Sequence, residues 1–158
     1  MRSIETISPD ATTAARIVRG YLADVASRWY GRPATDAEVD RALLDEPFDD
    51  LQGDTGALFV AFEDGHPVGC AGVRFLGDVA ELTKVFTSPL HRGRGVGSEL
   101  LRAVERSCRA RAVTTLRLDT RAELTEACAM YERNGFERIT AFNDDPYSDR
   151  WYRKALRP

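Results

Sequence analysis

The sequence predicts an α/β domain built on one mixed β-sheet. Segments with the two-residue hydrophobic period of strands alternate with segments that keep the 3.6-residue period of helices. Residues 63–66 form a turn signal between two apolar strands, which predicts an antiparallel hairpin. Farther along, a strand, a glycine-rich turn and a long amphipathic helix lead to another strand, which predicts a crossover to a parallel neighbour.

The predicted elements follow from local start and stop signals. Ser8 and Pro9 supply a cap and an early proline for the first helix, and Thr35-x-x-Glu38 has the spacing of a capping box for the second. In the long helix, we expect Val96 and Leu100 to face inward and Glu105 to face outward. The expected elements are strand 3–7, helix 8–29, helix 35–46, strands 58–62, 68–75 and 79–87, helix 95–111, strand 113–119, a helix ending at 134, and strands 136–142 and 150–156.

Length and composition fit one globular domain over residues 1–158. The chain is long enough to bury a core, and its 43% hydrophobic and 30% charged residues are ordinary for such a domain. A net charge of −3 and a pI near 5.5 argue against nucleic acid or an anionic membrane as a partner. The sequence shows neither a long apolar run nor a signal peptide, so we expect a cytoplasmic protein without a membrane partner.

The cysteines and histidines predict no metal site. Cys70, Cys108 and Cys128 lack the spacing of metal ligands or of a disulfide framework, and His66 and His91 lie far from any cysteine pair. We therefore expect buried free thiols in a reducing compartment.

The most informative segment is the turn before the long helix. Its glycines at alternate positions allow a tight turn and a close approach of a ligand to the backbone. The free N–H groups and positive dipole end of the following helix favour an anion, and the arginines of the turn favour phosphate. The segment reads Arg92-Gly93-Arg94-Gly95-Val96-Gly97.

Two common nucleotide-binding motifs fit this turn poorly. A Walker A loop requires a lysine after a glycine, and none follows here. A dinucleotide fingerprint requires a third glycine where this chain has Ser98. A nucleotide-binding α/β protein is therefore disfavoured.

The turn instead matches the pattern Arg/Gln-x-x-Gly-x-Gly/Ala, preceded by a strand that ends in Ser88-Pro89. A second segment downstream, Ala127-Cys128-Ala129-Met130-Tyr131-Glu132-Arg133-Asn134-Gly135-Phe136, matches Ala-x-x-Leu-Tyr-x-x-x-Gly-Phe. Over residues 4–156 the chain resembles the GNAT family of N-acetyltransferases. The resemblance implies a central, mostly antiparallel sheet of six to seven strands, with helices on both faces and a splay between the two central strands.

The resemblance also implies acetyl-coenzyme A (acetyl-CoA) as co-substrate and no metal. It implies that the main chain of Val85 and Thr87 holds the pantetheine arm, that the Val85 N–H stabilises the oxyanion, and that Tyr131 protonates the leaving thiolate. From its spacing alone, Tyr131 fits better as a core residue with its hydroxyl bonded to the backbone, whereas the resemblance favours the catalytic role. Many members carry an asparagine seven residues before this tyrosine, where this chain has Leu124. The resemblance also implies that the pyrophosphate is bound by Arg92, Gly93, Arg94, Gly95, Val96, Gly97 and Ser98.

The general base is left open by the sequence. Glu81 lies on the strand that precedes the turn, and some family members carry a base glutamate there. Alternatively, Glu81 only forms an ion pair with Lys84 or Arg74. Asp119 and His91 are weaker candidates, and His91 fits better on the rim of the phosphate site.

The acceptor site lies outside the shared motifs. Asn143, Tyr147 and Trp151 belong to a loop rich in aromatic and hydrogen-bonding groups, which could line an acceptor pocket, form a dimer contact or seal the core. The acidic run at residues 45–50 could attract a cationic amine or simply face water.

The sequence thus predicts an acyltransferase that moves an acetyl group to an amine by direct attack. The acceptor could be a small molecule, an amino acid or a protein or peptide amine, and the protein could be a homodimer. The alternative is a non-catalytic acyl-CoA-binding regulatory module, which would need the same phosphate-binding turn but not the tyrosine.

Overall fold

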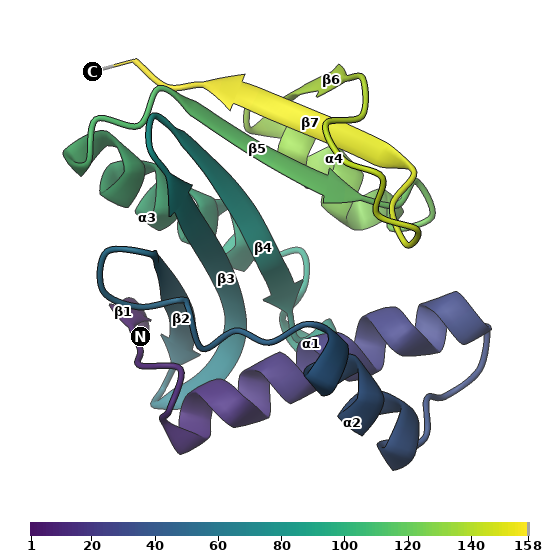
Figure 1. Ribbon diagram of the computed structural model, residues 1–158. Helices are drawn as coiled ribbons and strands as arrows, with labels where there is room; N and C mark the ends of the chain where they lie inside the picture. The colour runs from purple at the N-terminus through teal and green to yellow at the C-terminus, as the bar shows by residue number, and fades with distance from the viewer. Residues whose placement is uncertain (158) are drawn as a thin grey trace.

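The computed structural model describes residues 1–157, so the last residue of the predicted domain 1–158 lies outside the described residues. One sheet in the strand order β1-β2-β3-β4-β5-β7-β6 carries helices on both faces (Figure 1). The elements are β1 (Arg2–Thr6), α1 (Thr12–Tyr30), α2 (Asp36–Asp45), β2 (Gly56–Glu63), β3 (His66–Leu76), β4 (Val79–Thr87), the 3-10 turn η1 (Pro89–His91), α3 (Val96–Ala110), β5 (Thr115–Thr120), α4 (Thr125–Arg133), β6 (Glu137–Ile139) and β7 (Arg150–Ala155).

The sheet is mixed, as the sequence predicts. β1 to β4 pair in antiparallel order, β4 and β5 pair in parallel, and β7 pairs antiparallel with both β5 and β6. The β2–β3 turn places Asp64 and Gly65 at φ values of 51° and 81°, which is the conformation of a type I′ hairpin turn. The capping box of Thr35 and Glu38 at the start of α2 is also confirmed.

Two apolar cores lie on opposite faces of the sheet. Alternate residues of β2 divide between them, since Phe59 packs with α3 and α4 whereas Val60 packs with α1 and α2. The helices on one face thus belong to the second half of the chain, and those on the other face belong to the first half (Figure 1).

β4 and β5 are paired over only three rungs. Their register runs from Val79 opposite Thr115 to Glu81 opposite Arg117, although β4 continues to Thr87 and β5 to Thr120. Beyond Glu81 the two strands diverge (Figure 1), so the β5-facing edge of β4 has no strand partner there among the described residues. This is the splay that the family resemblance implies.

A β-bulge interrupts β4 just beyond the divergence. Ala71 of β3 faces both Lys84 and Val85, and Lys84 has a left-handed φ of 53°. The bulge reverses the faces of the strand: Leu82 packs in the core of α3 and α4, whereas Phe86 packs in the core of α1 and α2.

Most element boundaries shift by one or two residues from the sequence prediction, and two of them, the start of α1 and the end of β6, differ by more. α1 begins at Thr12, because Ser8 accepts a hydrogen bond from the backbone of Asp10 and closes a turn ahead of the helix. β6 ends at Ile139 instead of continuing to residue 142, because the chain leaves the sheet and the Phe142 ring packs against the Arg117 guanidinium, 4.2 Å away.

The expectation that Glu105 faces outward is wrong. Its side chain is 5% exposed and accepts a hydrogen bond of 2.9 Å from Lys154 Nζ of β7. Arg109 lies 3.5 Å from the same oxygen. The cation from β7 is distant in sequence, so the helical pattern could not reveal that this carboxylate is buried.

Lys154→Met is expected to lower the free energy of unfolding by about 2–3 kcal/mol, because it leaves the buried Glu105 carboxylate without its closest partner. Urea unfolding of the variant measures this loss. Arg153→Met on the same strand removes an exposed pair with Glu137 and should change stability by less than about 0.5 kcal/mol. Equal losses in the two variants would contradict the interpretation.

Candidate functional site

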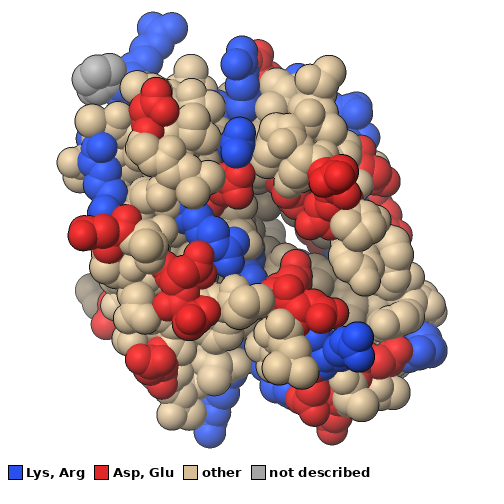
Figure 2. All heavy atoms as spheres, viewed as in Figure 1, with Lys and Arg blue, Asp and Glu red and all other residues tan. Residues whose placement is uncertain are grey.

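A cleft of about 940 Å³ opens where β4 and β5 diverge. β4 from Glu81 to Thr87 forms one wall, the starts of α3 and α4 close one end, and α1 with the loop after α2 closes the other. Figure 2 shows the molecule hollowed in this region, with acidic side chains around the opening. We call the end near α3 the phosphate half. We call the other end the acceptor half, after the predicted acceptor residue Asn143; it is lined by Tyr21, Asp45, Glu46, Pro47, Asp49, Asp50, Arg74, Lys84, Phe142, Asn143 and Asp145.

The phosphate half is built on the first turn of α3. Gly95 is the N-cap residue with a φ of 82°, and no side chain within residues 1–157 caps the helix. Val96, Gly97 and Ser98 follow and line the cleft. The first N–H groups of a helix have no partner within it, and the helix dipole is positive at this end, so this turn can bind an anion.

The glycines of the turn are needed for different reasons. Gly93 and Gly95 have φ values of 76° and 82°, which other residues rarely adopt, although a β-carbon at either would meet no described atom within 4 Å. At Gly97 a β-carbon would collide with Met130 Sδ of α4. The first two glycines therefore fix the turn, and the third allows α3 to pack closely against α4.

The arginine side chains of the turn are held by protein carboxylates. Arg92 donates from Nε to the Thr87 carbonyl at 3.0 Å, and its Nη2 lies 3.2 Å from Asp24 Oδ2 of α1. Arg94 Nη1 lies 3.5 Å from Glu63 Oε2. In this arrangement both guanidinium groups brace the turn, which leaves the backbone amides of α3 as its unpaired donors toward the cleft.

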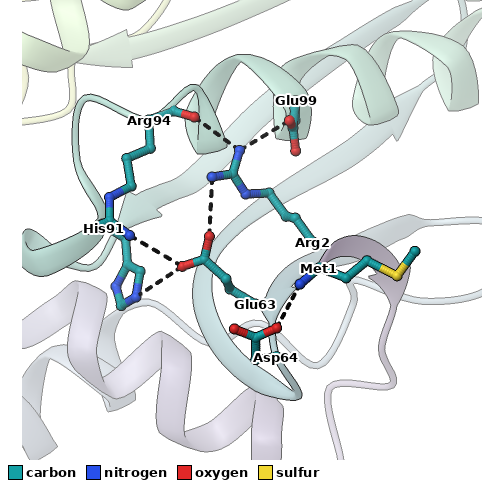
Figure 3. A network of polar contacts seen from close by, with 7 residues as sticks. All are labelled: Met1, Arg2, Glu63, Asp64, His91, Arg94 and Glu99. Atoms are coloured by element: carbon teal, nitrogen blue, oxygen red, sulfur yellow. Dashed lines mark hydrogen bonds and ion pairs between the residues drawn. The ribbon is translucent and has the colours of Figure 1, made fainter.

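A polar network fixes the outer side of the turn (Figure 3). Arg2 of β1 donates to the Arg94 carbonyl at 3.0 Å and to Glu99 at 3.1 Å, and it lies 3.4 Å from Glu63. Glu63 also lies 3.4 Å from His91 Nε2. Through these contacts, β1 and the β2–β3 hairpin hold the phosphate-binding turn in place.

Tyr131 lies between the core and the cleft. Its ring packs against Phe136 and Tyr152, with centroids 5.7 and 5.8 Å away, and the residue also lines the cleft. Its hydroxyl forms no hydrogen bond with any residue from 1 to 157, so the backbone bond allowed by the sequence is not found. Burial raises the pKa of Tyr131, which keeps the hydroxyl protonated.

Glu81 lies at the last paired rung of β4 and β5 and lines the cleft. Arg117 donates to its Oε1 from Nε at 3.1 Å and from Nη2 at 2.7 Å. The expectation of a pair with Lys84 or Arg74 is therefore wrong, because Arg74 binds Asp50 at 2.7 Å and Lys84 lies beyond the bulge. The second oxygen of Glu81 accepts no hydrogen bond within the described chain.

The three predicted acceptor residues are placed differently. Asn143 lines the cleft, donates to Asp119 at 2.8 Å and accepts from Trp151 Nε1 at 2.9 Å. Trp151 therefore supports Asn143 from behind. Tyr147 packs edge-on against Trp29 of α1, with ring centroids 5.0 Å apart, and so connects the last loop to α1.

Sequence reasoning missed several residues of the acceptor half. Tyr21 of α1 lies in this half, and burial raises its pKa. Glu46 keeps contact with solvent, but crowding by protein atoms raises the pKa of its carboxyl. Burial lowers the pKa of the Lys84 ammonium. Only the position of Glu46 in an acidic run gave a signal in the sequence.

None of the helices formed by residues 1–157 combines the length and the apolar character needed to cross a membrane. No group of three or more His, Cys, Asp or Glu side chains in the same range is positioned to hold a metal ion.

Comparisons with known proteins agree with this geometry. The sequence model of the Acetyltransferase (GNAT) family matches residues 22–136. The uncharacterized N-acetyltransferase YjgM of Escherichia coli is 31% identical over 135 residues, which cover 82% of this chain and 78% of that protein.

Solved structures share the fold over almost the whole chain. A GNAT acetyltransferase from Staphylococcus aureus superposes with a TM-score of 0.80 at 18% identity, covering 99% of this chain and all of that one. PaiA N-acetyltransferase from Thermoplasma acidophilum, solved in complex with coenzyme A, gives 0.78 at 17% identity and covers 98% and 99% of the two chains. By sequence and by fold, this chain belongs to the GNAT family of acetyltransferases.

Proposed function

We propose that this acetyltransferase moves the acetyl group of acetyl-CoA to an amine acceptor by direct attack. One observation carries the proposal: the uncapped first turn of α3, the unpaired edge of β4 and Tyr131 line the same continuous cleft. Phosphate binding, thioester positioning and proton donation can therefore act on one extended ligand.

The coenzyme would bind along the phosphate half. The amides of the turn and of the first turn of α3 would hold the pyrophosphate, with Arg92 and Arg94 bracing the turn. The main chain of Val85 and Thr87 would hold the pantetheine arm at the edge that β5 leaves free. The contributing residues would be Val85, Thr87, Arg92, Gly93, Arg94, Gly95, Val96, Gly97 and Ser98.

In the reaction, the neutral amine attacks the thioester carbonyl and forms the new C–N bond. The carbonyl oxygen becomes an oxyanion, which the Val85 N–H would stabilise. When the C–S bond breaks, the thiolate would take the Tyr131 proton. The cysteines take no part, because Cys70, Cys108 and Cys128 are buried and the acetyl group passes directly to the amine.

Glu81 is the proposed general base. Its second carboxylate oxygen is unbonded within residues 1–157, lines the cleft and can accept the amine proton directly or through a water molecule. Asp119 is less suited, because its two oxygens already accept hydrogen bonds from Asn143 and Ser148.

We place the acceptor in the acceptor half of the cleft, where Asn143 would contact it and Tyr147 and Trp151 would support the loop of Asn143.

We further propose that residues 1–158 act as one transferase domain, because β1, β6 and β7 lie outside the segment matched by the family model and still pair into the same sheet. The three buried free thiols suit a reducing compartment such as the cytoplasm.

Incubation of the protein with acetyl-CoA and a panel of amines tests the function. Release of free coenzyme A thiol should depend on the amine, and a reaction without amine corrects for the protein's own cysteines. Saturable coenzyme binding without any amine-dependent release would contradict the transferase. No coenzyme binding would contradict the assignment of the whole cleft.

Gly95→Val is expected to weaken acetyl-CoA binding by about tenfold or more, because a β-branched residue cannot hold the left-handed φ that shapes the turn. Titration calorimetry measures the affinity. Gly77→Val is the matched control, since Gly77 has a φ of 79° in the β3–β4 turn outside the cleft. If both variants lost stability equally and kept coenzyme affinity, the phosphate half would be wrongly assigned.

Tyr131→Phe is expected to lower kcat by about a hundredfold while coenzyme affinity stays within about twofold, because a general acid contributes roughly that factor. Its stability should not fall, since the lost hydroxyl has no hydrogen bond to residues 1–157. Tyr152→Phe is the control: it should lower stability and leave kcat unchanged, because the Tyr152 hydroxyl donates to Glu132 at 2.6 Å. An unchanged kcat in Tyr131→Phe would show that Tyr131 is a packing residue and does not act as the general acid.

A further inference from the structure

Lys84 is almost fully buried, and its ammonium has no partner within residues 1–157. Only 3% of the residue is exposed, and its ammonium forms no hydrogen bond or ion pair with residues 1–157. The chain has only two lysines, and the charge of the other one is compensated by a carboxylate, as is usual for charged groups away from water. Lys154 is 2.9 Å from the buried Glu105.

The backbone of Lys84 is also in an unfavourable conformation. Its φ of 53° at the bulge lies in the left-handed region, where glycine costs least. Folding alone would favour glycine at this position, yet the chain has a lysine with a long, charged side chain. Strained backbone of this kind concentrates at functional sites.

The surroundings of Lys84 lie in the acceptor half of the cleft. Its ammonium is near Glu46, Arg74 and Asp50, and the residue lines the cleft. Arg74 is already bonded to Asp50 and to the Pro47 carbonyl. Lys84 is therefore the cation of this half that is free to bind an anion, within the part of the chain that the structure describes.

We propose that Lys84 binds a carboxylate of the acceptor, so that the acceptors are amino acids or other short amino-carboxylic acids. This assignment rests on the proposed function, because it places the acceptor in this half of the cleft. Burial lowers the pKa of Lys84, whereas the nearby carboxylates of Glu46 and Asp50 favour its charged form. A carboxylate bound at Lys84 would favour the charged form further.

The position of Lys84 in the chain limits the spacing of the two acceptor groups. It is the residue before Val85, whose N–H is proposed to face the oxyanion. Because the two residues adjoin, we expect the carboxylate and the amine of the acceptor to lie close together.

Binding of a product analogue to the coenzyme A-loaded protein tests the carboxylate site directly. N-acetylglycine carries the carboxylate, whereas N-acetylglycinamide has the same shape without the charge. In protein labelled with 13C at lysine, the two Cε signals can be assigned with the Lys154→Arg variant. N-acetylglycine should shift the Lys84 signal and leave that of Lys154 in place, and N-acetylglycinamide should shift neither.

Substitution of Lys84 gives a second, independent readout. Lys84→Met should weaken N-acetylglycine binding by about tenfold or more, because it removes a charge-assisted hydrogen bond. Lys84→Arg should retain most of the affinity. Lys84→Met should unfold at the same or a higher urea concentration than the wild type, since it relieves the burial of an unpaired charge. This comparison separates lost binding from lost folding.

The outcomes distinguish this inference from the proposed function. Equal binding of the two analogues, or unchanged binding in Lys84→Met, would overturn the carboxylate site even if the enzyme acetylates other amines. Selective binding of N-acetylglycine without acetyl transfer to glycine or larger amino acids would support the site and count against the proposed reaction. Faster acetyl transfer to amino acid amides than to the free amino acids would also overturn the carboxylate site at Lys84.

Discussion

The parallel pairing of β4 and β5 stops after the rung of Glu81 and Arg117, and the functional half of the molecule depends on this stop. The two side chains form an ion pair at that rung, and the Phe142 ring covers the guanidinium. Beyond it, β4 has a free edge and the cleft has room. If the pairing continued, these backbone groups of β4 would bond within the sheet, and the space proposed for the coenzyme would be closed.

The phosphate half shows how a tight turn can be held rigid. Two glycines in the left-handed region shape it, and contacts from three distant segments hold it: Asp24 of α1, Glu63 of β2 and Arg2 of β1. With its arginines occupied in this way, the turn presents backbone amides to the ligand. Fixed amides need little reorganisation when an anion binds, which favours affinity.

Two side chains of the cleft lack, among the described residues, the partners that compensate polar groups in the cores. The cores on both faces of the sheet are apolar, and the buried Glu105 has its cation. At the cleft, by contrast, Lys84 is buried without a partner, and the Tyr131 hydroxyl has no hydrogen bond within residues 1–157. Both residues line the cleft, where a bound ligand can supply the missing partners, and this supports one reaction site.

The sequence by itself determined the features that depend on chain neighbours. β4 begins and ends where its pattern predicts, the capping box of Thr35 and Glu38 forms, and the glycine-rich turn leads into α3. These signals act over a few residues, and together with the tyrosine segment they were enough to indicate the family.

Only the tertiary structure decided the partners of the charged groups. Arg117, 36 residues from Glu81, takes the place that Lys84 or Arg74 was expected to fill. The bulge turns Lys84 into the acceptor half, and β7 brings Lys154 to a Glu105 that was expected to face water. Burial and ion pairing depend on the register between distant segments, which a local pattern does not contain.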